Sequence, residues 1–148
     1  MAGPDDACLA CRIVRGDHRP PGGLLWREGG LVLHALADPT PLAGWLVLTS
    51  ERHARAWYDL DAAPLAALGP AAARVMRVQR EALGAEHVYA LAIGDQLRHF
   101  HLHLVPRYDD TPQRLRGRGA FDARPDDALP AWRVVAAVES VRRALAAG

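Results

Sequence analysis

The chain has 148 residues, of which 50% are apolar and 24% are charged, and its formal net charge is +1. One folded domain is expected, because a chain of this size buries roughly 68–70% of the surface that its unfolded form exposes. A charge so close to neutral provides no broad basic surface for duplex DNA or an acidic membrane, so any recognition of phosphate must be local. No apolar run approaches the ~20 residues that cross a bilayer, and the N-terminus lacks the features of a signal peptide. We therefore expect a cytoplasmic protein with no membrane partner.

Five strands are predicted, in an order that favours an antiparallel sheet. The third is continuously apolar, which is typical of a central strand. The first two are separated by Gly29-Gly30, and the last two by a short turn at 94–96, so each pair is expected to be antiparallel. The predicted strands are 24–26, 31–36, 45–49, 87–93 and 99–105.

Two helices are predicted. The segment 61–83 is rich in alanine, leucine and arginine and is followed by Gly84, a common C-terminal cap, although Gly69-Pro70 could break it. The segment 131–146 carries apolar side chains on one face and should pack on the sheet or on a partner subunit. Strands gathered around one main helix, with a second helix at the end, predict a single α+β domain over residues 1–148, built on an antiparallel sheet. The apolar face of the C-terminal helix consists of Val134, Val135, Val138, Val141 and Leu145.

Residues 107–130 combine prolines, glycines and arginines with little apolar periodicity. They predict a long loop. Loops of this length are usually functional or mobile, and arginines suit an anionic ligand, so an anion-binding loop and a solvated loop both stay open. The arginines are Arg107, Arg114, Arg116, Arg118 and Arg124.

The only cysteines, Cys8 and Cys11, form a C-x-x-C pair. A reducing compartment argues against a structural disulfide, which leaves metal binding, redox chemistry or chance. The strand that precedes a thioredoxin-like redox pair is missing from the predicted elements. Half of a zinc site is the better interpretation, and because two thiolates do not complete a tetrahedral site, two more ligands must come from elsewhere. Histidines are the obvious donors.

Residues 99–105 read His-Phe-His-Leu-His-Leu-Val. Alternation of this kind predicts a half-buried strand, with His99, His101 and His103 on one face. Three interpretations of these histidines are possible. A solvent-exposed strand face that holds three successive histidines by chance would be rare. A metal centre could use two of them with a third ligand, and covalent catalysis could use a neutral imidazole to attack phosphorus.

This segment resembles the His-φ-His-φ-His-φ-φ signature of the histidine triad (HIT) superfamily of nucleotidyl hydrolases and transferases. The N-terminal C-x-x-C, the Arg52-His53 pair after the third strand, and Pro106-Arg107 after the triad occur in similar order in bacterial members. The resemblance covers about residues 8–108 and implies the HIT-like fold and a homodimer.

The resemblance implies that His101 is the nucleophile, attacking the α-phosphorus of a nucleoside phosphate derivative such as a phosphoramidate or a dinucleoside polyphosphate. His103 would contact the phosphate and assist the leaving group, and His99 would help to hold the constellation. Gln96 and Arg107 are the expected substrate-binding residues. A nucleotide is therefore the expected small-molecule partner.

Zinc-bearing members imply a structural zinc ion on Cys8, Cys11, His53 and His99. For His53, an ordinary surface histidine stays an alternative. A Cys₂His₂ set fills all four positions of a tetrahedral ion, so the zinc would stabilise the fold and not react. The remaining histidines, His18, His34 and His87, are expected to be ordinary surface or packing residues.

Two positions depart from the family's pattern. Asp95 stands where members usually have a glutamine, with Gln96 one residue later, and the acid that binds ribose is not in the second strand, where Leu36 stands and Asp38 is the nearest acid. A non-catalytic nucleotide-binding module is therefore one alternative, and a metal-dependent hydrolase with zinc on the triad is another. Nucleic-acid binding by the 107–130 loop is a poorer third, because few aromatic side chains accompany its arginines.

Overall fold

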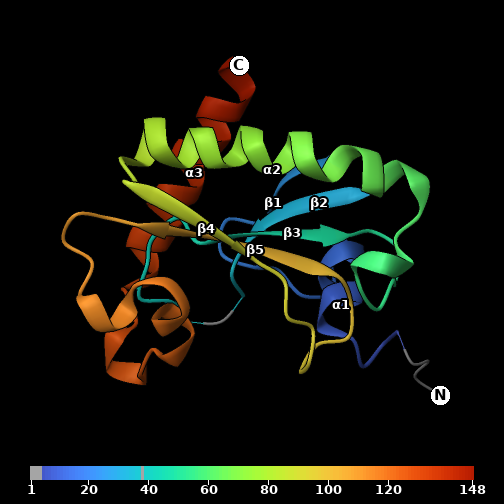
Figure 1. Cartoon of the computed structure of the whole chain (residues 1–148), viewed down its shortest axis with the longest axis horizontal. Helices are drawn as coiled ribbons and strands as arrows, with labels where there is room; N and C mark the ends of the chain where they lie inside the picture. The colour runs from blue at the N-terminus through green and yellow to red at the C-terminus, as the bar shows by residue number, and fades with distance from the viewer. Residues whose placement is uncertain (1–4, 38) are drawn as a thin grey trace.

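The computed structural model describes residues 5–37 and 39–148 and contains one antiparallel sheet with helices on both sides (Figure 1). The sheet has five strands in the order β1-β2-β3-β5-β4, and every neighbouring pair is antiparallel. The predicted α+β fold is therefore confirmed. The strands are β1 (Leu24–Glu28), β2 (Leu31–Ala35), β3 (Leu46–Ser50), β4 (His87–Leu91) and β5 (His101–Arg107).

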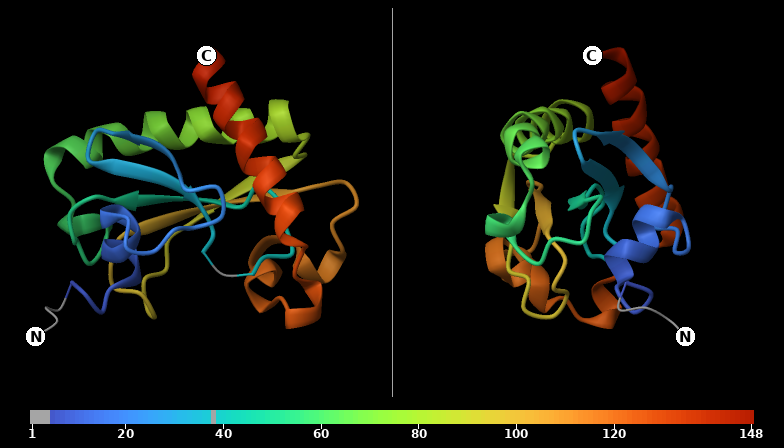
Figure 2. Two further views of the ribbon diagram at one scale, coloured as in Figure 1. Left: turned by 180° about the vertical axis from the view of Figure 1, so that it is seen from behind. Right: turned by 90° about the vertical axis from the view of Figure 1, so that its right-hand side faces the viewer.

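Two helices, α2 (Ala62–Leu83) and α3 (Ala131–Ala147), cover one face of the sheet, as the end view in Figure 2 shows. Alternate strand residues point to this face and bury apolar side chains against the helices. The C-terminal helix thus packs within its own chain, with Val135 at the exposed edge of its apolar face. Among the described residues, no helix combines the length and the apolar character needed to span a membrane. The main core includes Leu31, Leu33, Leu46, Leu48, Leu102 and Leu104 from the strands, and Leu68, Val75, Val138 and Val141 from the helices.

Helix α2 continues through Pro70 and ends at the predicted cap. Pro70 lies on the exposed side of the helix, where water can satisfy the carbonyl that loses its partner. Gly84 adopts a φ of 77°, its N–H donates to the carbonyl of Arg80, and the N–H of Ala85 donates to the carbonyl of Gln79. The possible break at Gly69-Pro70 therefore does not occur.

A short helix that the sequence did not predict, α1 (Leu9–Arg15), lies against the other face of the sheet (Figure 2). Cys8 caps it: its Sγ accepts a hydrogen bond from the N–H of Cys11, at 3.4 Å. Gly16, with a φ of 87°, ends it. Seven residues are too few for helical periodicity to stand out in a sequence.

The stretch 107–130 is not a structureless loop. It folds into three 3₁₀ helices, with Leu115 and Ala120 buried. Such short turns leave no periodic signal. Arg114 pairs with Asp127 inside this stretch. The three helices are η2 (Gln113–Leu115), η3 (Gly117–Asp122) and η4 (Pro125–Asp127), and a further one, η1 (Trp57–Asp59), precedes α2.

The register of the three central strands brings polar side chains together on the face opposite α2. His34 of β2 pairs with Val47 of β3, which pairs with His103 of β5. One step along the same face, Thr49 pairs with His101. Residues from three strands therefore converge there, although up to 69 positions separate them in the sequence.

Candidate active site and metal centre

A cavity of about 720 Å³ opens on this polar face of the sheet. Its volume lies within the range of roughly 300–1,000 Å³ that is usual for small-molecule sites. The floor is formed by β2, β3 and β5, and the walls come from α1, the β2–β3 and β4–β5 connections, and η3. The lining includes the polar side chains of His34, Thr49, Asp95, Gln96, His101, His103 and Asp122.

His101 is held in one tautomer. Its Nδ1 lies 2.7 Å from the main-chain oxygen of His99. Since a carbonyl oxygen only accepts, Nδ1 carries the hydrogen and donates it, which leaves a lone pair on Nε2. His101 lines the cavity, and its Nε2 has no hydrogen-bond partner within the part of the chain that the structure describes. The backbone thus prepares an imidazole whose free nitrogen can act as a nucleophile.

His103 is the second imidazole of the cavity and packs against two aromatic rings. The indole Nε1–H of Trp45 donates to its Nδ1 at 3.0 Å. The ring of Phe121, from η3, meets both of these rings edge-on, with centroids 5.1 Å from His103 and 4.9 Å from Trp45. Burial, followed by the charges of His101 and His34, lowers the pKa of His103 to about 4. His103 is therefore neutral near pH 7.

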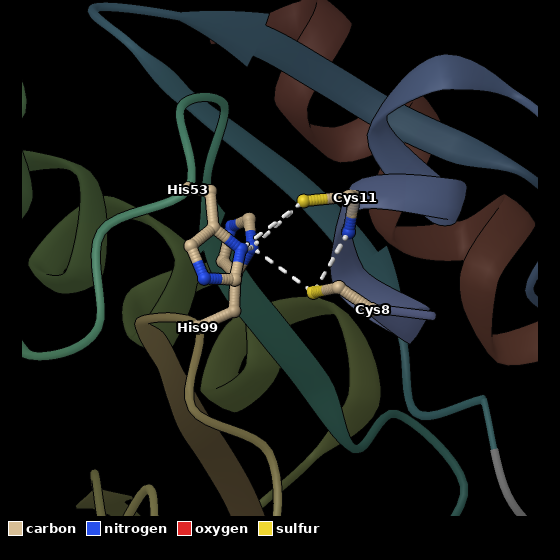
Figure 3. Close-up of side chains that lie close together, drawn as sticks. All are labelled: Cys8, Cys11, His53 and His99. Atoms are coloured by element: carbon tan, nitrogen blue, oxygen red, sulfur yellow. Dashed lines mark hydrogen bonds between the residues drawn. The ribbon is translucent and has the colours of Figure 1, made fainter. Parts of the chain in front are cut away.

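The second cluster consists of Cys8, Cys11, His53 and His99, whose four donor atoms all lie within 4.8 Å of one another (Figure 3). The Nδ1 atom of His99 is 3.4 Å from each cysteine Sγ. The Nδ1 atom of His53 is 3.3 Å from Cys11 Sγ and 3.2 Å from His99 Nδ1. The structure thus brings together the four residues predicted as metal ligands, from α1, the segment after β3 and the segment before β5.

The donor set and its spacing fit a zinc ion. Tetrahedral zinc with bonds of about 2.0–2.3 Å places its ligand atoms roughly 3.3–3.8 Å apart, close to the separations in this cluster. Nε2 of His99 bonds to the main-chain oxygen of Ser50 at 2.7 Å, so its hydrogen lies there and Nδ1 faces the cysteines with a lone pair. Burial, helped by Cys8, raises the pKa of the Cys11 thiol to about 12, so thiolate ligands require the charge of a bound cation.

Comparisons with known proteins give the fold a name. The chain matches a Hit-like protein involved in cell-cycle regulation from Bartonella henselae at a TM-score of 0.73 and 14% identity, over 97% of this chain and 99% of that one. A hypothetical histidine triad nucleotide-binding protein from Sulfolobus tokodaii gives a TM-score of 0.72 at 16% identity, over 95% and 93%. The chain has the histidine triad fold.

A zinc-bound histidine triad family protein from Mycobacterium smegmatis is also similar, with a TM-score of 0.66 and 20% identity over 95% of this chain and 99% of that one. No family model and no curated protein matches the sequence. The histidine triad fold therefore rests on structural likeness, and the resemblance noted in the sequence agrees with it.

In this histidine triad fold, His99 is set apart from the other two histidines of the motif. Strand β5 begins at His101, so His99 lies just before it. The ring of His99 is fully buried between Ser50 and the two cysteines and is not part of the cavity lining. The reason is the carbonyl of Ser50, which captures Nε2 and turns the ring toward the metal cluster. His99 reaches the cavity only through its main-chain oxygen, which His101 uses.

The two predicted substrate-binding residues lie in different places. Gln96 lines the cavity from the β4–β5 connection. Arg107 lies at the far end of β5, outside the cavity lining, where it contacts the Tyr89 hydroxyl at 3.5 Å and Glu86 at 3.9 Å. An extended strand rises about 3.3 Å per residue, which puts Arg107 roughly 13 Å from His103. None of the arginines in 107–130 lines the cavity, and Asp38 lies outside the described residues.

Sequence reasoning missed two groups of cavity residues. His34, interpreted as an ordinary packing residue, lies on the cavity floor, with Nδ1 2.8 Å from Ala35 O and Nε2 2.8 Å from Thr49 Oγ1. Burial lowers its pKa to about 4. Trp45 and Phe121 form the aromatic wall beside His103. Alternation along β2 places His34, with Val32 and Leu36, on the face opposite the core, and this was a signal that His34 is not a core residue. Which residues surround it depends on the register of the neighbouring strands, which the sequence does not show.

Proposed function

We propose that this protein is a nucleotidyl hydrolase or transferase that cleaves a nucleoside phosphate derivative at the α-phosphorus. One observation carries the proposal: the His101 Nδ1–H donates to the His99 carbonyl, which leaves the Nε2 lone pair free in a cavity of about 720 Å³. An imidazole nucleophile suits transfer at phosphorus, because the phosphorus–nitrogen bond that it forms is easily cleaved again. The fold likeness to a histidine triad nucleotide-binding protein supports the same substrate class.

In the proposed reaction, Nε2 of His101 attacks the α-phosphorus, and the bond to the leaving group breaks. A nucleotidyl-histidine results, which water or another acceptor then resolves, restoring the lone pair of Nε2. His103 contacts the phosphate and assists the leaving group, and Gln96 binds the substrate from the connecting segment. His99 acts through its main-chain oxygen, which keeps His101 in the reactive tautomer.

The base and sugar would lie against the apolar wall of the cavity. That wall is built by α1 and by the segment that follows β2, while the polar floor faces the phosphate. Flat rings are well accommodated by apolar walls with a few polar groups. The residues of this wall are Leu9, Ala10, Ile13, Leu36, Pro39 and Pro41.

The zinc ion that we assign to Cys8, Cys11, His53 and His99 is structural, since four protein ligands leave no open position for substrate or water. When bound, it would join α1 to the segments before β5 and after β3. Among the described residues, the triad itself does not form a group with metal-ligand spacing, which disfavours the alternative of a catalytic zinc on His101 and His103.

A second copy of the chain is the other partner we propose, in the cytoplasm. Strand β4 supports it, because β4 forms an edge of the sheet and the nearby Ile93 is 60% exposed. Sedimentation equilibrium at micromolar concentration tests the dimer, and a single species of 16.1 kDa would contradict it.

The decisive experiment for the activity is a trapped intermediate. The protein is incubated with a nucleoside 5′-phosphoramidate or a dinucleoside polyphosphate, quenched in base, in which phosphohistidine is stable, and digested for mass spectrometry. We expect a nucleotide adduct on the peptide that contains His101, and its loss in His101→Gln. Tight binding of a mononucleotide without adduct or turnover would instead support the non-catalytic binding module.

A further inference from the structure

The aromatic wall beside His103 has a chemical role that follows from the direction of one hydrogen bond. An indole N–H can only donate, so Nδ1 of His103 accepts from Trp45 and carries no hydrogen. A neutral imidazole then holds its hydrogen on Nε2. This nitrogen makes no hydrogen bond within the described part of the chain, and His103 lines the cavity.

The two neighbouring imidazoles therefore offer a substrate opposite hydrogen-bonding roles, one as an acceptor and the other as a donor. His101 offers a lone pair on Nε2, and His103 offers an N–H on Nε2. Their ring centroids are 5.0 Å apart, which places both within reach of one phosphate group. A nucleophile beside a fixed donor is the arrangement that stabilises negative charge as it develops on phosphate or on a leaving oxygen.

Burial and the nearest titratable side chains favour the neutral form of His103. Protonation at Nδ1 would set a ring N–H against the indole N–H of Trp45. His101 and His34 are the titratable neighbours that contribute to its low pKa, about 4. Asp95 and Asp122 line the same cavity from the β4–β5 connection and η3, and their carboxylates would favour the protonated ring, but neither is among the groups that shift the pKa of His103.

We propose that Trp45 is a positioning residue that fixes His103 as a neutral Nε2–H donor, so that the site favours substrates whose leaving group departs as a weakly basic anion. The inference rests on the proposed function and narrows its substrate class to phosphoanhydrides and similar esters, in preference to phosphoramidates of basic amines.

The step balances without proton transfer from His103. The His101 Nε2 lone pair forms the bond to phosphorus, the bond from phosphorus to the leaving oxygen breaks, and that oxygen keeps the electron pair. The Nε2–H of His103 remains covalently bound to its ring while hydrogen bonded to the departing anion. A neutral imidazole is a very weak acid, so a basic amine has to obtain its proton from water instead. In the second step, water attacks phosphorus, the electron pair returns to His101, and the proton of water goes to solvent.

The first test reads the state of His103 directly and requires no turnover. Proton–nitrogen correlation spectra of protein labelled with ¹⁵N-histidine distinguish the two tautomers. We expect wild-type His103 as the Nε2–H form with no protonation above about pH 5, in line with its pKa of about 4. Finding the Nδ1–H form in the wild type would overturn the proposal by itself, even if no variant folds.

The second test removes only the indole donor. Trp45→Phe keeps an aromatic ring beside Phe121, and we expect a mixture of tautomers with protonation at higher pH. We also expect kcat to fall about three- to tenfold, the worth of one net hydrogen bond, with little change in KM. Unchanged spectra in this variant would overturn the proposal. Trp26→Phe is the matched control, because that indole also donates, but to the exposed Glu28.

The third test compares leaving groups in the wild type. We expect kcat/KM for nucleoside 5′-aryl phosphates to rise steeply as the pKa of the phenol falls. Phosphoramidates of alkylamines should be far slower than the 4-nitrophenyl ester. Equal rates for the two would overturn the substrate preference. If no ester is turned over and no adduct forms on His101, the proposed function itself fails, while the spectra still decide whether Trp45 fixes His103.

Discussion

The metal cluster and the cavity are neighbours that share one stretch of chain, yet their polar atoms are arranged in opposite ways. In the cluster, the donor atoms of Cys8, Cys11 and His99 are buried and point at one another, and the second nitrogen of His99 is satisfied by Ser50. In the cavity, His101 and His103 each use one nitrogen internally and leave the other free for a ligand. The same residue type is thus fully engaged within the chain in one place and leaves a nitrogen free for a ligand in the other. Variants that separate stability from turnover test this division.

The largest effect is expected from His101→Ala. Removing the nucleophile should lower kcat by on the order of 10⁴- to 10⁶-fold, as for other covalent catalysts. The free energy of unfolding should change by less than about 1 kcal/mol, because the ring is only half buried and makes one hydrogen bond. Steady-state kinetics and urea unfolding measure the two quantities. His87→Ala, at an exposed histidine of β4, is the control, and retention of turnover in His101→Ala would refute the mechanism.

Loss of the metal should do the reverse of His101→Ala, with the larger effect on stability and the smaller one on turnover. Zinc at a thousand times its dissociation constant stabilises by about 4 kcal/mol, which corresponds to about 8–16 °C in Tm for a chain of this size. Cys11→Ser, or chelation of the wild type, should remove this increment. Calorimetry with metal analysis of the same samples measures it. A Tm that does not change when all metal is removed would contradict a structural zinc site.

Acid should lower the free energy of unfolding through His34, the buried cavity histidine that the sequence did not single out. The pKa of His34 is about 4 in the folded chain, compared with an ordinary 6.5, so the unfolded state binds the proton first as pH falls. The contribution is complete above about pH 6.5 and is lost down to about pH 4, up to about 3 kcal/mol. Urea unfolding across this range should therefore show a flatter decline in His34→Gln, with His87→Gln as control. An identical decline in wild type and variant would rule out this role.

The smallest predicted effect concerns Leu97, which belongs to both regions. It packs against Cys8 and Cys11 and also lines the cavity. Because it is only half buried, Leu97→Ala should cost about 1 kcal/mol, which is about 2–4 °C in Tm and about fivefold in KM if the same contacts serve the ligand. Leu65→Ala, on the exposed side of α2, controls for the loss of a leucine. A change in Tm alone would assign Leu97 to the cluster.

The sheet, the main helix and the C-terminal helix could be predicted because their signals are local. Alternation in 99–105 and the apolar run of β3 depend on the period of a strand, and Gly84 ends α2 by its own backbone freedom. The predicted bounds of β5 were wrong by two residues at each end, and the surroundings of His99, just before the strand, are not local in the sequence. The ring of His99 is oriented by Ser50, which lies 49 positions away in the sequence.

The cavity was only partly predictable for the same reason. The triad motif points to His101 and His103, but His34 and Trp45 become neighbours of the triad only through the register of β2, β3 and β5. Phe121 reaches His103 through η3, a turn whose sequence has no periodic signal. Arg107 shows the opposite case. It is close to the triad in the sequence, but an extended strand places it far from the histidines in space.

The cap of α1 links the two regions through a thermodynamic cycle. Sγ of Cys8 is one of the four possible metal-ligand atoms of the cluster, and it also accepts a hydrogen bond from the first turn of α1. This helix has seven residues and is too short to persist alone in water. Leu9, Ala10 and Ile13 of the same helix form part of the cavity wall. If the proposed ion and nucleotide both bind, each would favour the ordered helix, and each would raise the affinity for the other by the same factor. Nucleotide occupancy in a cell would then follow the supply of the metal, without any contact between the two ligands.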